Sequence, residues 1–240
     1  MIVCNSHPRL AARWVHAFAA ALLAAACCPA AAQVPPTPSE LAAYAGLHAA
    51  AARGDAAEIA RLAAAGADPN ARDAHGRTPL HVAAFLARHG AMRALVAAGA
   101  DPRALEADRY DIATIAAVRD DAGTLRLALA LGADPRAVTS RYDGTALIAA
   151  AHLGHAEVVR VLIAAGAPLD HVNNLGWTAL MEAVVLGDGG PRHTETVRAL
   201  VEAGADVNLP DRQGTTPLAH ARRRGYDAIA SVLAAAGARE

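Results

Sequence analysis

The sequence predicts an all-α solenoid, in which stacked helix-turn-helix units are joined by hairpin-like loops. The first observation is a Gly-Ala pair that recurs at spacings of 33, 33, 34, 38 and 33 residues, its glycines being Gly66, Gly99, Gly132, Gly166, Gly204 and Gly237. The second is a potential helix-capping residue placed 21 positions before four of these glycines: Thr78, Asp111, Thr145 and Thr216. A period of this size indicates supersecondary units that bury their apolar faces against one another.

The composition supports many thin layers rather than one thick core. Hydrophobic residues make up 54% of the chain, but most of them are alanine and only 3% of all residues are aromatic. Small side chains let helices approach closely and bury little area each. The net charge is −1 and the chain contains no lysine. This balance provides neither a general basic field for nucleic acid nor a polybasic stripe for a membrane surface.

The first 32 residues have the features of a secretory signal peptide. A basic opening with Arg9 and Arg13 precedes an apolar run over residues 14–26, which is too short to span a bilayer as a stable anchor. Small residues at 30–32 precede Gln33 and suit a signal peptidase. We therefore expect cleavage after Ala32 and export to the periplasm. No membrane span is expected to remain after cleavage.

All three cysteines of the chain fall within this segment, at Cys4, Cys27 and Cys28. A lipoprotein anchored at Cys27 or Cys28 is therefore an alternative, although alanine lies three residues before each of them, where lipoprotein signals usually have leucine. A buried N-terminal helix of a cytosolic protein is a second alternative. Without residues 1–32 the chain has no cysteine, which excludes disulfides and thiolate chemistry.

The remainder divides into a proline-rich leader at 33–38, which cannot be helical, and a repeat domain at 39–240. The units of the repeat domain are approximately 39–72, 73–105, 106–139, 140–172, 173–210 and 211–240. Thr178 lies five residues too early relative to its glycine, because the fifth unit contains an insertion at 187–191 with the sequence GDGGP. We interpret this insertion as a tolerated surface loop between two helices; the alternative is a second contact point for a partner.

Each unit carries start and stop signals for its helices. In Thr78-Pro79, and again at 216–217, threonine caps the helix and proline occupies its first turn. The second helix of the fourth unit, around 157–163, has an apolar stripe at helical spacing. Gly166 then ends that helix in a left-handed conformation. Aspartates two residues after the recurring glycines begin a tight hairpin to the next unit: Asp68, Asp101, Asp134 and Asp206.

These segments resemble ankyrin repeats. GRTPLHVAA (76–84), GWTALMEA (176–183) and GTTPLAHA (214–221) resemble the first helix of the repeat. GHAEVVRVLIAAGAPLD (154–170) and HTETVRALVEAGADVN (193–208) resemble its second helix and the following turn. The resemblance covers residues 39–240 in six units. It implies a module that contacts other proteins through a concave surface of hairpin tips and first-helix ends.

The third unit departs most from this pattern. It has RYDIATIAA at 109–117, with Asp111 in place of threonine. Ala128 occupies a position that is leucine in the other five units. If the burial of that leucine is lost, this layer is about 2 kcal/mol less stable than its neighbours. We expect the helices near 112–130 to open first, and the arginines at 222–224 to belong to an exposed capping layer.

Candidate residues for chemistry are sparse. His152 and His155 lie three apart, and His81 and His89 eight apart, but no HExxH, CxxC or nearby third ligand accompanies them. In the ankyrin pattern, a histidine at the position of His81 ties neighbouring turns together. No serine of residues 33–240 lies in a Gly-x-Ser-x-Gly turn. The sequence implies no metal and no cofactor, and an enzyme is only a remote alternative.

Aligning the units on Thr78 predicts the partner-binding residues of the concave face. They are Arg77, Phe85, Tyr110, Arg119, Arg141, Tyr142, His152, Asn174, Trp177 and Arg212. Tyrosine, tryptophan and arginine are the types that dominate interface hot spots. The alternative is that Tyr110 and Tyr142 pack on the neighbouring hairpin and that Phe85 belongs to the core.

The predicted function is therefore non-catalytic recognition of a protein partner in the periplasm, by a monomer that binds no nucleic acid. A rigid groove that prearranges its side chains loses little entropy on binding. The alternative is an inhibitor, such as an immunity protein that masks a periplasmic or secreted enzyme. That alternative is an analogy, because this fold supports many tasks.

Overall fold

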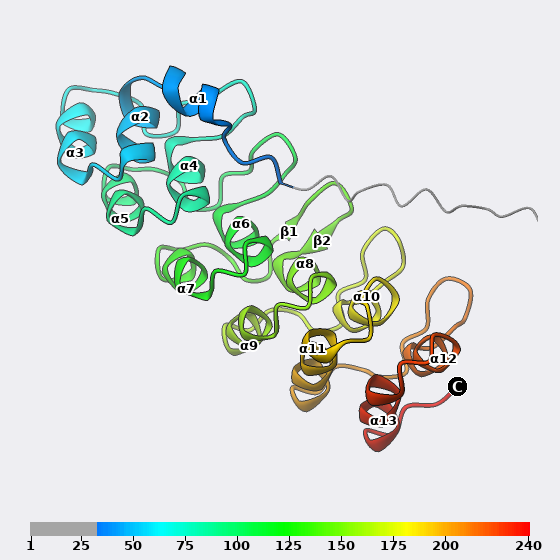
Figure 1. The fold of residues 1–240 in the computed structure, drawn as a ribbon. Coiled ribbons are helices and arrows are strands. Elements are labelled where there is room, and N and C mark those ends of the chain that lie inside the picture. The colour runs from blue at the N-terminus through cyan, green and yellow to red at the C-terminus, as the bar shows by residue number, and fades with distance from the viewer. Residues whose placement is uncertain (1–32) are drawn as a thin grey trace, which may run out of the picture. The chain divides into compact units, whose positions relative to one another are not determined.

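Helices of this chain are arranged in antiparallel pairs, and each pair forms one unit of a stack (Figure 1). The computed structural model describes residues 33–240, which form one unit of structure. The expected signal peptide at 1–32, and with it the alternative anchor at Cys27 or Cys28, lies outside the described residues. Residues 33–37 of the predicted leader are non-helical, but Pro38, also predicted to be non-helical, is the first residue of the first helix, which Thr37 caps. This correction follows from the tolerance of a helix for proline in its first turn.

The helices are described here in the order of the predicted units. The first unit contains α1 (Pro38–Ala43), α2 (Gly46–Arg53) and α3 (Ala56–Ala64). The pairs of the next two units are α4 (Pro79–Phe85) with α5 (His89–Ala97), and α6 (Ile112–Val118) with α7 (Ala122–Ala130). The last three pairs are α8 (Ala146–His152) with α9 (Ala156–Ala164), α10 (Ala179–Val185) with α11 (Pro191–Glu202), and α12 (Pro217–Arg223) with α13 (Asp227–Ala235).

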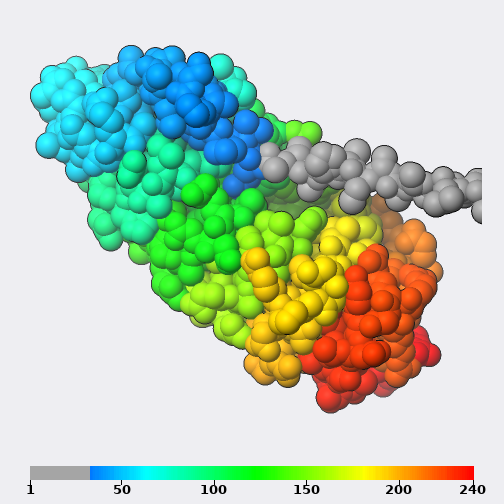
Figure 2. Space-filling view, in the orientation of Figure 1, coloured from blue at the N-terminus to red at the C-terminus, as the bar shows by residue number. Residues whose placement is uncertain are grey.

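First helices stack on first helices, from α2 to α12, and second helices form a parallel row. Figure 2 shows the units of residues 33–240 following one another in chain order, so that each contacts mainly its neighbours. The contact between α5 and α7 is the weakest within the row of second helices. The core runs through the stack and consists mostly of alanine, leucine, isoleucine and valine. The predicted solenoid is confirmed.

Helix starts are capped as the sequence predicts. The Thr78 hydroxyl accepts a hydrogen bond from the His81 amide, and Thr145, Thr178 and Thr216 make the equivalent bond in their own units. At the other end of a helix pair, Gly166 has a φ of 83°, the left-handed conformation predicted for it.

In the third unit Asp111 caps α6 in the place of a threonine. Its Oδ1 accepts hydrogen bonds from the amide and the hydroxyl of Thr114, both at 2.7 Å. The carboxyl is 2% exposed, and burial raises its pKa. Ala128, which replaces the usual leucine, is fully buried in α7. The departures of this unit therefore leave its helices intact, and the loosest point is the contact of α7 with α5.

The hairpin loops, here called fingers, project from the first-helix side of the stack. One finger contains a two-residue antiparallel strand pair, β1 (Val138–Thr139) and β2 (Gly144–Thr145), with Val138 opposite Thr145. Within residues 33–240 this is the one departure from an all-α fold. None of the described helices combines the length and apolar character that a bilayer crossing requires.

The insertion at 187–191 is packed rather than loose. α11 is 12 residues long, whereas the second helices of the other five units have nine. The Tyr226 hydroxyl donates to the Gly187 carbonyl at 2.9 Å, and the Tyr226 ring covers Gly189 so closely that a Cβ there would lie 2.3 Å from it. The insertion therefore remains a surface loop but is held by packing against the sixth unit, because its glycines permit this close approach.

Candidate protein-binding surface

Each of the five fingers is closed by one side-chain oxygen that accepts two backbone hydrogen bonds. In the first finger, Asp73 Oδ1 accepts from the amides of His75 and Arg77, both at 2.9 Å. The other four oxygens belong to Glu106, Ser140, Asn173 and Asp211. Each lies five residues before a helix cap, a spacing that the sequence displays and that our sequence analysis missed.

The finger tips are also bonded to one another. The Ala107 amide donates to the His75 carbonyl at 3.0 Å, and the Ser140 amide to the Arg109 carbonyl at 3.1 Å. Farther along, the Asn174 amide donates to the carbonyl of Tyr142 at 2.9 Å. Arg212 Nη2 then donates to the Asn174 carbonyl at 2.6 Å. Because the tips form a continuous bonded row, their geometry is set before any partner arrives, which lowers the entropic cost of binding.

Two of the predicted partner-binding residues are buried, and these predictions are corrected. Arg77 is 1% exposed, and its guanidinium donates to Asp73 at 2.7 Å, to Glu40 at 2.5 Å and to the Val34 carbonyl at 3.1 Å. Its donors point beneath the first finger toward α1, an element without a counterpart in the other units. Phe85 is 3% exposed and belongs to the core cluster, as the alternative interpretation held.

The other eight predicted residues reach the surface. Arg119, Arg141, Asn174 and Arg212 are exposed, while Tyr110, Tyr142, His152 and Trp177 are half-buried. Six of the eight belong to the fingers, and Arg119 and His152 lie at the far ends of α6 and α8. A seven-residue first helix is about 10 Å long, so the two groups lie at opposite edges of the surface formed by the first helices and the fingers. This surface, which the resemblance to ankyrin repeats implies is concave, is here called the groove.

Several of these side chains are already engaged within the protein. Arg141 forms an ion pair with Asp108 of the preceding finger, and the Asn174 side chain donates to the Arg141 carbonyl at 3.1 Å. Burial and the nearby carboxylates of Asp108 and Glu106 raise the pKa of the Tyr110 hydroxyl, which therefore stays protonated and available as a donor. These contacts fix the orientation of the fingers while leaving their outer faces open.

The structure adds apolar residues that the sequence analysis did not select as partner-binding. Six large hydrophobic side chains are exposed among the described residues. Five of them fall between positions 138 and 186, at Val138, Leu153, Val172, Leu175 and Leu186. Three lie on the third and fourth fingers, and Leu153 and Leu186 lie at the ends of α8 and α10. Their concentration in one stretch of the chain makes this part of the stack the candidate interaction site.

The floor of the groove carries two chains of hydrogen-bonded polar groups. In the first, Glu182 of α10 is 5% exposed, lies 2.9 Å from Nδ1 of His152 and accepts from the Asn173 side chain at 2.7 Å. This arrangement joins α8, α10 and the fourth finger. A buried carboxylate held by two partners fixes the local geometry and leaves one edge of His152 accessible.

The second chain lies in the sixth unit. Nε2 of His220 lies 2.7 Å from Oδ2 of Asp211, and Nδ1 of His220 lies 2.8 Å from Nη2 of Arg223. Burial raises the pKa of Asp211, but the hydrogen bonds from His220 and two backbone amides outweigh burial and keep this pKa below its usual range. The carboxylate therefore stays ionised and anchors the fifth finger to α12.

Histidines elsewhere serve as ties between units. His81 Nε2 lies 3.0 Å from the Ala104 carbonyl and 3.2 Å from the Tyr110 carbonyl, which confirms the tying role expected of it. His89 bonds to Thr124, and His155 to the Ala117 carbonyl. Within residues 33–240, no three or more histidine, cysteine or acidic side chains are grouped as metal ligands would be.

Stacked helix pairs whose fingers are hydrogen-bonded into one row define a repeat solenoid. The sequence matches the family profile described as "Ankyrin repeats (3 copies)" over residues 19–106 and 113–211. The chain therefore belongs to the ankyrin repeat family. Ankyrin repeats are protein–protein interaction modules, and the fold is generally a non-catalytic scaffold.

Individual relatives agree with this assignment. An ankyrin repeat domain from Acinetobacter baumannii AYE has a TM-score of 0.75 and 45% identity, covering 80% of this chain and 98% of that one. The ankyrin repeat domain of Bcl-3, a member of the IkappaB protein family, has a TM-score of 0.74 and 30% identity, covering 82% and 87%. The ankyrin repeat protein YahD of Escherichia coli (strain K12) is 39% identical over 90 residues, which are 37% of this chain and 45% of that relative. The YahD match thus spans less than half of that protein.

Proposed function

We propose that this protein is an exported, non-catalytic binding module that holds a protein partner in the groove of its fourth and fifth units. The observation that carries this proposal is that five of the six large hydrophobic side chains exposed among the described residues lie between positions 138 and 186, three of them on fingers whose backbones are mutually bonded. Trp177, half-buried at the base of the fourth finger, supplies an aromatic anchor beside Leu175. Such an arrangement offers apolar area on a rigid support, with little ordering required on binding.

The place of action that we propose is the periplasm. The basis is the N-terminal segment, in which arginines, a short apolar run and small residues precede Gln33. In this proposal the exported chain begins at Gln33 and acts as a monomer. Fractionation of cells, followed by mass determination of the isolated chain, tests this part separately. A chain that retains residues 1–32, or that stays in the cytoplasm, would contradict export.

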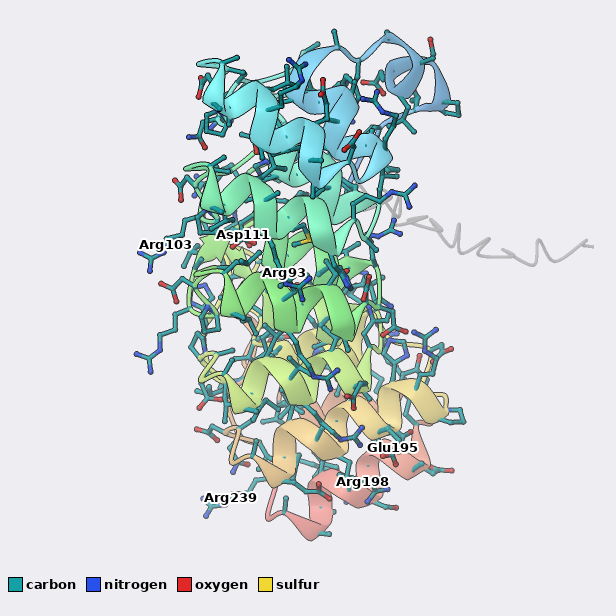
Figure 3. The ribbon with its side chains drawn as sticks, turned by 90° about the vertical axis from the view of Figure 1, so that its left-hand side faces the viewer. Arg93, Arg103, Asp111, Glu195, Arg198 and Arg239 are labelled. Carbon is teal, nitrogen blue, oxygen red and sulfur yellow. The ribbon has the colours of Figure 1, made fainter. Side chains whose placement is uncertain are left out.

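Site-specific photocrosslinking tests the binding surface. A photoreactive amino acid is placed at Leu175 or Leu186 in the groove, and at Arg93 on α5 as a matched control. Figure 3 shows that Arg93 lies on the side of the second helices, away from the fingers. We expect one discrete crosslinked protein from positions 175 and 186 and none from position 93. Equal crosslinking at all three positions would remove the proposed surface.

A further inference from the structure

We infer that the bound segment of the partner is acidic as well as apolar, and that its carboxylates meet Arg212 and Arg223 beside the fifth finger. This inference rests on the proposed function and names the chemistry of its partner. Residues 212–226 contain four arginines and neither aspartate nor glutamate. They form the fifth finger tip, α12 and the turn that follows it, which is the C-terminal end of the groove.

The two guanidinium groups are held in place by neutral acceptors. Arg212 lies over Gly176, where a Cβ would come within 2.6 Å of the arginine Cγ, and it donates to the Asn174 carbonyl. Arg223 lies 2.8 Å from His220 Nδ1, and His220 Nε2 in turn lies 2.7 Å from Asp211. These bonds fix both side chains, and neither forms an ion pair with a carboxylate of residues 33–240.

Other arginines of the chain differ from Arg212 and Arg223 in having a partner for their charge. Arg222 is paired with Glu240, and Arg224 lies with its guanidinium carbon 5.9 Å from the centroid of the Tyr226 ring. On the row of second helices, Arg126 pairs with Glu157 at 2.5 Å and Arg160 with Glu195 at 3.1 Å. At the sixth unit, by contrast, Arg212 and Arg223 are held in position without a carboxylate partner among the described residues, so an incoming carboxylate can pair with them.

The basic end is continuous with the apolar surface. Arg212 is bonded to Asn174, and Asn174 directly precedes Leu175, which is 40% exposed on the fourth finger. A segment that covers Leu175 and Trp177 and continues toward α12 would therefore pass both guanidinium groups. The complementary occupant is an extended protein segment with apolar side chains followed by acidic ones.

The test uses the full chain with Trp14→Phe, so that Trp177 is the one remaining tryptophan and reports on the groove. A synthetic poly-L-glutamate peptide is titrated and the fluorescence of Trp177 is followed. We expect a saturable change that weakens as salt is added. The R212E/R223E variant should bind roughly tenfold more weakly or not at all, R212K/R223K should retain most of the binding, and R93E should match the parent chain.

Several outcomes would overturn the inference. R93E and R212E/R223E losing affinity equally would show a general charge effect, and unchanged binding by R212E/R223E would exclude the site. Tighter binding of a single-stranded DNA oligonucleotide than of poly-L-glutamate would indicate a nucleic-acid ligand instead. Thermal unfolding of each variant, followed by circular dichroism, separates loss of binding from loss of fold. If positions 175 and 186 crosslink a partner equally well with and without R212E/R223E, the inference of an acidic partner segment is wrong, while the proposed function of protein binding stands.

Discussion

Arg192 Nη2 lies 3.2 Å from Asp120 Oδ2, although 72 residues separate the two in sequence. Arg192 belongs to the first turn of α11 in the fifth unit, and Asp120 to the loop between α6 and α7 in the third, so the contact passes over the whole fourth unit. In solenoids most contacts join nearest neighbours. The insertion at 187–191 accompanies the longer α11, and the ion pair therefore braces the third unit, where the row of second helices is loosest.

Removing this brace with Arg192→Gln is expected to affect local opening more than global stability. Both side chains are largely exposed, so the pair contributes less than about 1 kcal/mol to the free energy of unfolding. Amide hydrogen exchange should nevertheless show α6 and α7 exchanging earliest in the parent chain, and earlier still in the variant. The matched control is Arg198→Gln, which removes a pair with Glu195 within α11 itself. Uniform protection of all six units would contradict the weak third layer.

Alanine substitutions at two glycines with the same backbone conformation measure how much the packing of the insertion contributes to stability. Gly189 and Gly225 have φ values of 72° and 69°, so alanine at either position costs about 1 kcal/mol in backbone strain. A Cβ at Gly189 would lie 2.3 Å from the Tyr226 ring, whereas a Cβ at Gly225 would meet nothing within 4 Å. We expect Gly189→Ala to lower the free energy of unfolding by a further 1–3 kcal/mol or so relative to Gly225→Ala, measured by urea denaturation. Equal losses would mean that the loop is free to move away.

The architecture could be predicted because the repeat multiplies each local signal six times. Thr78, Asp111 and Gly166 are interpretable individually, and their recurrence at one phase fixes both the units and the helix pairs. The candidate site was less predictable. The alignment of the repeats assigns each position to one face of the stack. It cannot show that Arg77 turns inward toward Glu40, because Glu40 belongs to α1, a helix that is present only in the first unit and is not repeated.

The inward ion pair of Arg77 leads to a prediction about the N-terminal unit. Burial raises the pKa of Asp73, but hydrogen bonds from Tyr44 and Arg77 outweigh burial and bring this pKa to about 2. Arg77→Ala leaves the carboxylate of Asp73 partly buried and removes the contact with Glu40, so we expect a loss of about 3 kcal/mol, the lower end for a broken buried pair. Arg141→Ala, which breaks an exposed pair with Asp108, should cost less than about 1 kcal/mol. Similar melting temperatures for the two variants would contradict this difference.

His81 makes the stability of the second unit depend on pH. Burial lowers its pKa from 6.5 to about 4, because the buried ring is shielded from the water that would stabilise its protonated form; the hydrogen bonds to the Ala104 and Tyr110 carbonyls oppose this shift but do not outweigh it. Between these two values the unfolded chain binds a proton that the folded chain does not. The free energy of unfolding therefore falls as the pH drops below about 6.5, by up to about 3 kcal/mol near pH 4.

Urea denaturation at pH 7 and pH 5 measures this effect. We expect the parent chain to lose roughly 2 kcal/mol more than His81→Gln over this interval, since glutamine can keep the capping interaction with Thr78 but does not titrate. His171→Gln provides the control, because His171 lies on an exposed finger and bonds only to the Asp143 carbonyl. If His81→Gln and the parent chain lose the same stability between pH 7 and pH 5, another group carries the pH dependence and the role assigned to burial at this position is wrong.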